Sequence, residues 1–149
     1  MKRIIFICLF SLFWSSVAIS EPKLIDCTTQ IRKQIVKDYL RQIDNMIHAV
    51  RIVESGLNDF AVGSSQDVGP LQITPIRIAD YNQRTGKNYS HADCFKWEVS
   101  REVFMYYANL IGYIPTNFEE VCRKWNRGSQ WQDEKGQQYW ERVKSNINV

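Results

Sequence analysis

Apolar residues recur at intervals of three and four along the chain that follows residue 20. The positions with this spacing are Ile31, Ile35, Tyr39, Ile43, Ile47, Val50 and Val53. Such a period places them on one face of a helix, which we expect to run from near Thr28 to Glu54. Thr28 or Thr29 can cap its first turn. Gly56 can end it, because glycine adopts the left-handed conformation without strain.

The middle of the chain predicts a polar connection followed by a short helix. Residues 56–69 are rich in Gly, Ser, Asp and Asn, which favour turns, and a small hairpin can form between Phe60 and Gly69. Thr74 followed by Pro75 is typical of an N-cap and a first helical position. We therefore expect a helix from Pro75 to about Gln83.

The C-terminal part predicts three more helices. Asp93 can open the first of them, and Gly112 can end it. Its inner face would carry Val99, Val103, Tyr106 and Leu110. A capping box at Thr116–Glu119 can begin the second helix, and the third would carry Tyr139 and Val143 on its apolar face. No repeat or linker interrupts this pattern, so we expect a single, mainly α domain.

The first twenty residues differ from the rest in composition. Two basic residues precede the apolar run 4–13, and small residues follow at positions 18–20. This order is typical of a secretory signal peptide, residues 1–20, and the run is too short to span a bilayer. We therefore expect an exported protein, periplasmic or extracellular, with one mature domain of residues 21–149 and no stable membrane anchor.

Charge and cysteine content restrict the partners. The whole chain has a net charge of +3, which falls to about +1 without the signal, so we expect no nucleic-acid partner. Cys27, Cys94 and Cys122 would remain in the exported chain, allowing one disulfide with a free thiol or an intermolecular pair. We favour Cys94 with Cys122, since both lie in the C-terminal half. No CxxC pair or histidine cluster indicates a metal, and we expect no cofactor.

The first predicted helix ends with a carboxylate on its apolar face. Glu54 lies four residues after Val50 and seven after Ile47, just ahead of Gly56. Burial and the negative end of the helix dipole should both raise the pKa of Glu54. An acid that stays neutral near neutral pH suits general-acid cleavage of a glycosidic bond. The alternative is a glutamate that ends its helix and points to water.

Four short motifs follow one another in an order that resembles lytic transglycosylases of the soluble (SLT) type. Glu54-Ser55 resembles that family's Glu-Ser pair, and Val68-Gly69-Pro70-Leu71-Gln72-Ile73 resembles its Gly-Leu-Met-Gln-Ile motif. Lys124-Trp125-Asn126-Arg127-Gly128 resembles Ala-Tyr-Asn-x-Gly, and Tyr139-Trp140-Glu141-Arg142-Val143 resembles the closing Tyr-containing motif. The resemblance runs from about Ile47 to Val143. It implies a lysozyme-like α fold and cleavage of the glycan strands of peptidoglycan.

The resemblance also implies roles for single residues. Glu54 would act first as acid and then as base on the β-1,4 bond between N-acetylmuramic acid and N-acetylglucosamine, giving a 1,6-anhydro product. The residues that would contact the substrate or support Glu54 are Ser55, Gln72, Asn126 and Tyr139. Each also has a structural interpretation: a polar helix end for Ser55, a buried amide for Gln72, a helix C-cap for Asn126 and a core aromatic for Tyr139.

Several positions depart from the family pattern or match it loosely. Pro70 and Leu71 stand where the family has Leu and Met, and Trp125 stands where it has Tyr. Pro70 stiffens the backbone, and Trp125 lacks a hydroxyl but keeps a stacking face. Ser64 or Ser65 matches the family's serine ahead of the second motif, although either can be a plain turn residue. These differences bear on the sugar contacts more than on the reaction.

Other functions fit the same residues. A goose-type-like lysozyme would hydrolyse the same bond with Asp59 or Asp67 as the base for a water. A non-catalytic cell-wall-binding protein could keep the fold without the activity, although a buried acid beside Gln72 and Asn126 argues against it. Besides the glycan strands, an envelope-spanning secretion or conjugation machine is a candidate partner for so small an exported enzyme.

Overall fold

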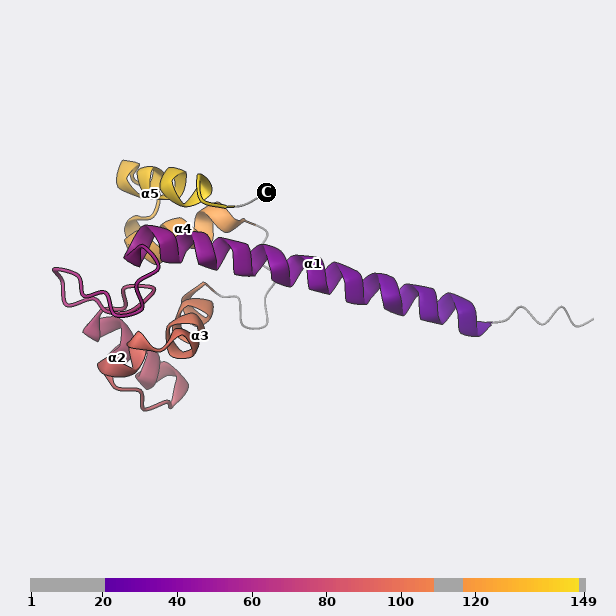
Figure 1. The fold of residues 1–149 in the computed structure, drawn as a ribbon, viewed down its shortest axis with the longest axis horizontal. Helices are drawn as coiled ribbons and strands as arrows, with labels where there is room; N and C mark the ends of the chain where they lie inside the picture. Colours follow the sequence, from indigo (N-terminus) through magenta and orange to yellow (C-terminus); the bar gives the residue numbers. More distant parts are fainter. Residues whose placement is uncertain (1–20, 109–116, 148–149) are drawn as a thin grey trace, which may run out of the picture. The chain divides into compact units, whose positions relative to one another are not determined.

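The computed structural model describes residues 21–108 and 117–147. The predicted signal peptide, residues 1–20, lies outside this part of the chain, as does the predicted helix end at Gly112. Over the described residues the fold is mainly α, as predicted, and contains no extended strand (Figure 1). Among these residues, no helix combines the length and apolar character that crossing a membrane requires. The chain divides into two units at Lys37–Asp38.

Helix α1 spans Glu21–Ser55, so it begins before the predicted Thr28 and continues just beyond Glu54. Gly56 follows it with a positive φ of 59°, and its N–H donates to the carbonyl oxygen of Ile52 at 3.0 Å. The predicted glycine stop is therefore confirmed, because glycine adopts this left-handed conformation without strain.

The two parts of α1 differ in burial although they share the same apolar spacing. In the first unit, Ile31 and Ile35 are 54% and 62% exposed. In the second unit, Ile43 and Ile47 are 2% and 0% exposed. The second part of the helix therefore supplies one wall of a hydrophobic core, as expected for an amphipathic helix with a packed neighbour.

Four shorter α-helices and two 3-10 helices complete the described chain. They are α2 (Pro75–Thr85), η1 (His91–Phe95), α3 (Trp97–Tyr107), α4 (Phe118–Arg127), η2 (Gly128–Gln130) and α5 (Glu134–Lys144). Helices α4 and α5 pack against each other (Figure 1). Helix α2 begins as predicted, since the Thr74 side chain accepts the N–H of Arg77 at 3.2 Å and Pro75 occupies the first turn.

Two helix starts differ from the prediction. Asp93 does not open α3, because its carboxylate accepts the N–H of Ser90 at 2.9 Å in a capping box that begins η1. Helix α4 is capped by Asn117 rather than by the predicted Thr116. The Asn117 side chain accepts the N–H of Glu120 at 3.2 Å, which satisfies an otherwise unpaired donor of the first turn.

The connection between α1 and α2, the α1–α2 loop (residues 56–74), contains two isolated antiparallel bridges, and one of them, between Val62 and Val68, lies within the span of the predicted small hairpin. Val68 pairs with Val62 on one side and with Ile73 on the other. Val68 and Ile73 exchange both backbone hydrogen bonds, at 3.1 and 2.9 Å. Both side chains are buried in the core, so this short ladder fixes the loop beside the end of α1.

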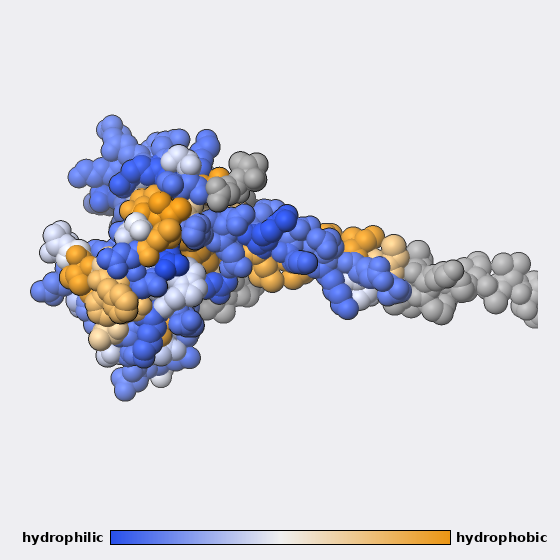
Figure 2. All heavy atoms as spheres, viewed as in Figure 1, coloured by the Kyte–Doolittle hydropathy of each residue, from blue (hydrophilic) through white to orange (hydrophobic). Residues whose placement is uncertain are grey.

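The core of the second unit collects apolar side chains from the buried part of α1, the α1–α2 loop and every later α-helix. Apolar side chains also lie on the surface, as the orange areas of Figure 2 show. In and just after the α1–α2 loop, the large exposed apolar residues are Leu57, Phe60, Val62 and Ile76, at 44%, 78%, 68% and 83%.

The predicted disulfide between Cys94 and Cys122 is wrong, because both are free thiols, as is the exposed Cys27. Cys94 lies in η1 and Cys122 in α4, and each is fully buried in the core as a small apolar side chain. Burial raises the pKa of Cys94 and of Cys122 to about 12. Both thiols are therefore protonated packing groups.

Candidate active site

Glu54 is positioned by the last turn of α1 and bound by a residue of α5. Its Oε1 accepts a hydrogen bond from the Tyr139 hydroxyl at 2.7 Å. Tyr139 is 1% exposed, whereas Glu54 is partly buried. Both interpretations of Tyr139 therefore hold, since its ring belongs to the core and its hydroxyl reaches the acid. The bond occupies Oε1 of the Glu54 carboxyl.

The pKa of Glu54 is raised above its ordinary value, in the predicted direction, and burial is the largest cause. The Tyr139 hydrogen bond and the charges of Arg77 and Arg142 act in the opposite sense. The charge of Asp67 adds to the effect of burial. Glu54 thus keeps its proton to a higher pH than an exposed glutamate, which is the state a general acid needs.

The Tyr139 phenol is a stable hydrogen-bond donor to this carboxyl. Its pKa is raised well above the ordinary value, by burial first and then by the charge and hydrogen bond of Glu54. The guanidinium carbon of Arg142 lies 5.6 Å from the centre of the Tyr139 ring. Arg142, on α5, therefore places a positive charge beside both members of the pair.

The two candidate bases in the α1–α2 loop have different surroundings. Asp59 accepts from Arg51 of α1 at 2.6 Å, an ion pair that ties the loop to the helix. Asp67 accepts the N–H of Ser65 at 3.1 Å within the turn. Only Asp67 is among the charges that shift the pKa of Glu54. Of the two aspartates, Asp67 is therefore the one that acts on the acid.

Gln72 uses its amide nitrogen inside the loop. Nε2 donates to the carbonyl oxygens of Gly69 at 2.9 Å and Ala61 at 3.3 Å. The residue itself has a positive φ of 49°, which is unusual for a side-chain-bearing residue. These bonds give Gln72 a structural role in shaping the loop. A contact with substrate stays a prediction, and it would use the remaining amide oxygen.

Neither Ser55 nor the two serines ahead of the second motif, Ser64 and Ser65, form a hydrogen bond to Glu54. The Ser55 hydroxyl donates to the carbonyl oxygen of Arg51 at 3.1 Å, a bond within the last turn of α1. Ser64 and Ser65 are exposed in the loop, where the Ser65 N–H bonds to Asp67. The helix-end interpretation of Ser55 therefore agrees with its observed contact.

Asn126 is exposed on the last turn of α4, and its interpretation as a C-cap is wrong. Helix α4 ends at Arg127, and Gly128 caps it with a φ of 55°. Asn126 instead borders a cavity of about 740 Å³ between the end of α4 and α5, which Arg142 also lines. The hydrogen bond that Glu54 accepts comes from Tyr139 and not from Asn126.

No protein-family model, curated protein or solved structure matches this chain. The resemblance to lytic transglycosylases therefore rests on the four sequence motifs alone. Within residues 21–108 and 117–147, no three His, Cys, Asp or Glu side chains gather in a way that could hold a metal ion. The polar groups that meet at the end of α1 are the partly buried carboxyl of Glu54 and the hydroxyl of Tyr139.

Two charged neighbours of Glu54, Arg77 and Arg142, were assigned no role from the sequence. Arg77 lies in the first turn of α2, and it acts electrostatically on Glu54 from there. Its Nη2 donates to the carbonyl oxygen of Trp125 at 2.9 Å, across 48 positions of sequence. A single arginine near the start of a helix carries no local signal, so only the folded arrangement relates it to the acid.

Proposed function

We propose that this protein is a peptidoglycan lytic transglycosylase that acts through Glu54. The observation that carries this proposal is a partly buried carboxyl, with a raised pKa, that accepts a 2.7 Å hydrogen bond from Tyr139. The ordered motifs from Glu54 to Tyr139 support it, because they associate this acid with one family of glycan-cleaving enzymes. The signal-peptide pattern of residues 1–20 supports export to the compartment that holds the substrate.

The reaction needs one carboxyl and no cofactor. Because Tyr139 donates to Oε1, Oε2 is the oxygen that would carry the proton of neutral Glu54. Oε2 would give that proton to the glycosidic oxygen as the bond from the muramoyl C1 to that oxygen breaks. The 6-hydroxyl of the same sugar would then bond to C1 and return its proton to Glu54. The enzyme is restored, water is not consumed and a 1,6-anhydro end is formed.

Charge around Glu54 suits both halves of this cycle. The neutral acid is favoured by burial, and the anion that exists between the two proton transfers is favoured by Tyr139, Arg77 and Arg142. The oxocarbenium-like state that forms at the same time would be helped by the substrate's own acetamido group. A second protein carboxylate is therefore not required.

Hydrolysis by a lysozyme-like route is the second candidate, and a specific observation favours Asp67 as its base. Asp59 is paired with Arg51 at 2.6 Å, whereas Asp67 carries no ion pair among the described residues and acts on Glu54 through its charge. An inverting hydrolase would use such a loop carboxylate to activate a water on the opposite side of the sugar.

Mass analysis of the products separates the two reactions. Purified peptidoglycan is digested with the protein, and the released fragments are weighed. The transglycosylase reaction gives muramoyl ends that lack one water relative to hydrolysis, because the 6-hydroxyl has taken the place of the water. Reducing ends would reject it in favour of Asp67-assisted hydrolysis. If the glycan strands stay intact after prolonged digestion, both reactions are rejected and the protein is better described as a cell-wall-binding protein.

A further inference from the structure

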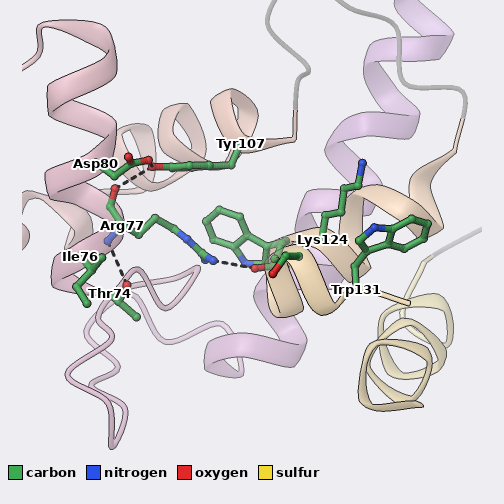
Figure 3. Close-up of a pocket in the computed structure, with 10 residues that line it drawn as sticks. Thr74, Ile76, Arg77, Asp80, Tyr107, Lys124 and Trp131 are labelled. Atoms are coloured by element: carbon green, nitrogen blue, oxygen red, sulfur yellow. Dashed lines mark hydrogen bonds between the residues drawn. The ribbon is translucent and has the colours of Figure 1, made fainter. Parts of the chain in front are cut away.

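A separate pocket of about 610 Å³ lies between α2 and the end of α4 (Figure 3). Neither Glu54 nor Tyr139 lines it. The lining residues that matter for its chemistry are Arg77, Asp80, Tyr107, Lys124, Trp125 and Trp131. Figure 3 shows Arg77 extending from α2 toward α4, with Lys124 and Trp131 beyond it on the α4 side.

The pocket combines aromatic faces with cations. The guanidinium carbon of Arg77 lies 4.2 Å from the centre of the Trp125 ring and 5.7 Å from that of Tyr107. The Lys124 ammonium lies 5.4 Å from the Trp131 ring. An aromatic ring holds a cation in place without neutralising it, so the positive charge of Arg77 stays available to a ligand.

Apart from Arg77, the charged side chains that line the pocket already have charged partners within the protein. Asp80 accepts from Arg84 at 2.8 Å and from the Tyr107 hydroxyl. Lys124 pairs with Glu120 at 2.6 Å, although both side chains are well exposed. The pocket therefore offers no unmatched negative charge of its own.

Arg77 is the exception, because no described residue forms an ion pair with it. Its Nη2 donates to the backbone oxygen of Trp125 at 2.9 Å, and burial lowers its pKa. Glu54 attracts it from a distance, but that attraction vanishes while Glu54 is the neutral acid. A partly buried guanidinium without a carboxylate partner is less stable than a paired one, and a ligand carboxylate would supply charge-assisted bonds.

We propose that this pocket binds the carboxylate-bearing stem peptide of peptidoglycan, an inference that rests on the proposed function. Arg77 would bind a carboxylate, Lys124 would add a second positive charge at the rim, and Trp131 would cover the apolar part of the peptide. The stem is attached to the muramoyl sugar, whose glycosidic bond Glu54 would cleave. Arg77 lines the pocket and also acts electrostatically on Glu54.

Direct binding tests the pocket independently of catalysis. The probes are a free stem tripeptide with all carboxylates ionised and the same peptide with its carboxylates amidated, each titrated calorimetrically into the purified protein. We expect the amidated peptide to bind about tenfold more weakly, since hydrogen bonds between ions are lost. Equal affinity for the two probes, or no binding of the free peptide, would overturn the inference.

Three variants locate the site on the protein. Arg77→Gln should weaken binding of the ionised peptide about tenfold, and Lys124→Gln about threefold, because Lys124 is exposed and already paired. Lys124→Gln removes no core contact, so it remains informative if Arg77→Gln fails to fold. Lys144→Gln, an exposed lysine on α5 outside the pocket, is the matched control. If Lys144→Gln weakens binding as much as Lys124→Gln does, the peptide is attracted by charge without a specific site, and the proposed site is rejected.

Cleavage assays separate failure of the pocket from failure of the proposed function. Strands that carry peptides are compared with strands from which an amidase has removed them. We expect Lys124→Gln to lower kcat/KM about threefold on the first substrate and to leave the second unchanged. Equal losses on both substrates would reject the pocket while keeping the enzyme. If neither substrate is cleaved, the proposed function fails, and the calorimetric comparison still decides whether the pocket binds the peptide.

Discussion

The end of helix α1 and the loop that follows it both carry carboxylates, but the partners of these groups differ. Glu54 meets a neutral donor, the Tyr139 hydroxyl at 2.7 Å, in a partly buried setting. Asp59 meets a cation, Arg51 at 2.6 Å. The partner of Glu54 carries no charge, whereas the partner of Asp59 forms an ion pair with it. The first arrangement suits catalysis, and the second suits attachment of a loop.

This contrast predicts that the two regions respond differently to the same chemical change. Replacing a carboxylate by its amide keeps the shape of the side chain and removes its charge and its proton chemistry. At Glu54 the main loss should be in rate, whereas at Asp59 it should be in stability. The largest effect is expected at the end of α1.

Glu54→Gln should lower the cleavage rate by at least about a hundredfold, because the amide cannot transfer a proton. The fold should persist. Burial raises the folded pKa of Glu54, so the stabilising contribution of this group is complete below its unfolded pKa and is lost as pH rises through the folded pKa. The amide never ionises, so its Tm at neutral pH should equal or exceed that of the parent. Turnover and thermal melts check both statements, and a variant with near-parent turnover would contradict the role of Glu54.

Tyr139→Phe should reduce kcat/KM about tenfold, since it removes a hydrogen bond to an ionisable group and leaves the ring in the core. That bond lowers the pKa of Glu54, so its loss should raise the pKa further. The alkaline limb of the pH–rate profile should therefore move to higher pH. A loss of rate with an unmoved limb would contradict the inference that the Tyr139 hydroxyl lowers the pKa of Glu54.

Asp59→Asn should destabilise the protein by about 1 kcal/mol and leave the chemistry at Glu54 in place, because a partly exposed ion pair contributes on that scale. Denaturant unfolding measures the first effect and product formation the second. Loss of activity in a folded Asp59→Asn protein would instead make the ion pair part of the catalytic site.

Asp67→Asn should have the smallest effect, at most about twofold in rate, if one carboxyl performs the reaction. The charge of Asp67 raises the pKa of Glu54, so its removal should move the alkaline limb to lower pH, opposite to Tyr139→Phe. The amide can still accept the N–H of Ser65, which keeps the turn. A loss of about a hundredfold would identify Asp67 as a base and the protein as a hydrolase.

The sequence predicts those features that depend on local spacing. Residues three and four apart share a helix face, so the burial of Ile43 and Ile47 followed from the pattern. The conformation of Gly56 and the cap at Thr74 depend on single residue types and were also predictable. The pairing of Glu54 with Tyr139 spans 85 positions, and the motif order indicated it where spacing could not.

Features that depend on distant contacts were not predictable. Ile31 and Ile35 repeat the spacing of the buried part of α1 but remain exposed, because a periodic face does not specify that a neighbour packs on it. Cys94 and Cys122 lie in the same half of the sequence, but both are free thiols in the folded chain, because position along the chain does not specify a disulfide pair. Arg77 has no local motif, and its relation to Glu54 exists only in the folded chain.

The protonation state of Glu54 is the claim on which the proposed reaction depends most directly. A carbon-detected NMR titration of the Glu54 carboxyl in the folded protein measures it without substrate. We expect a pKa above that of an ordinary glutamate, because burial outweighs the effects of Tyr139, Arg77 and Arg142. The Tyr139→Phe protein should titrate at a still higher pH. A Glu54 that titrates at or below the ordinary value would contradict the assignment of this residue as the neutral acid.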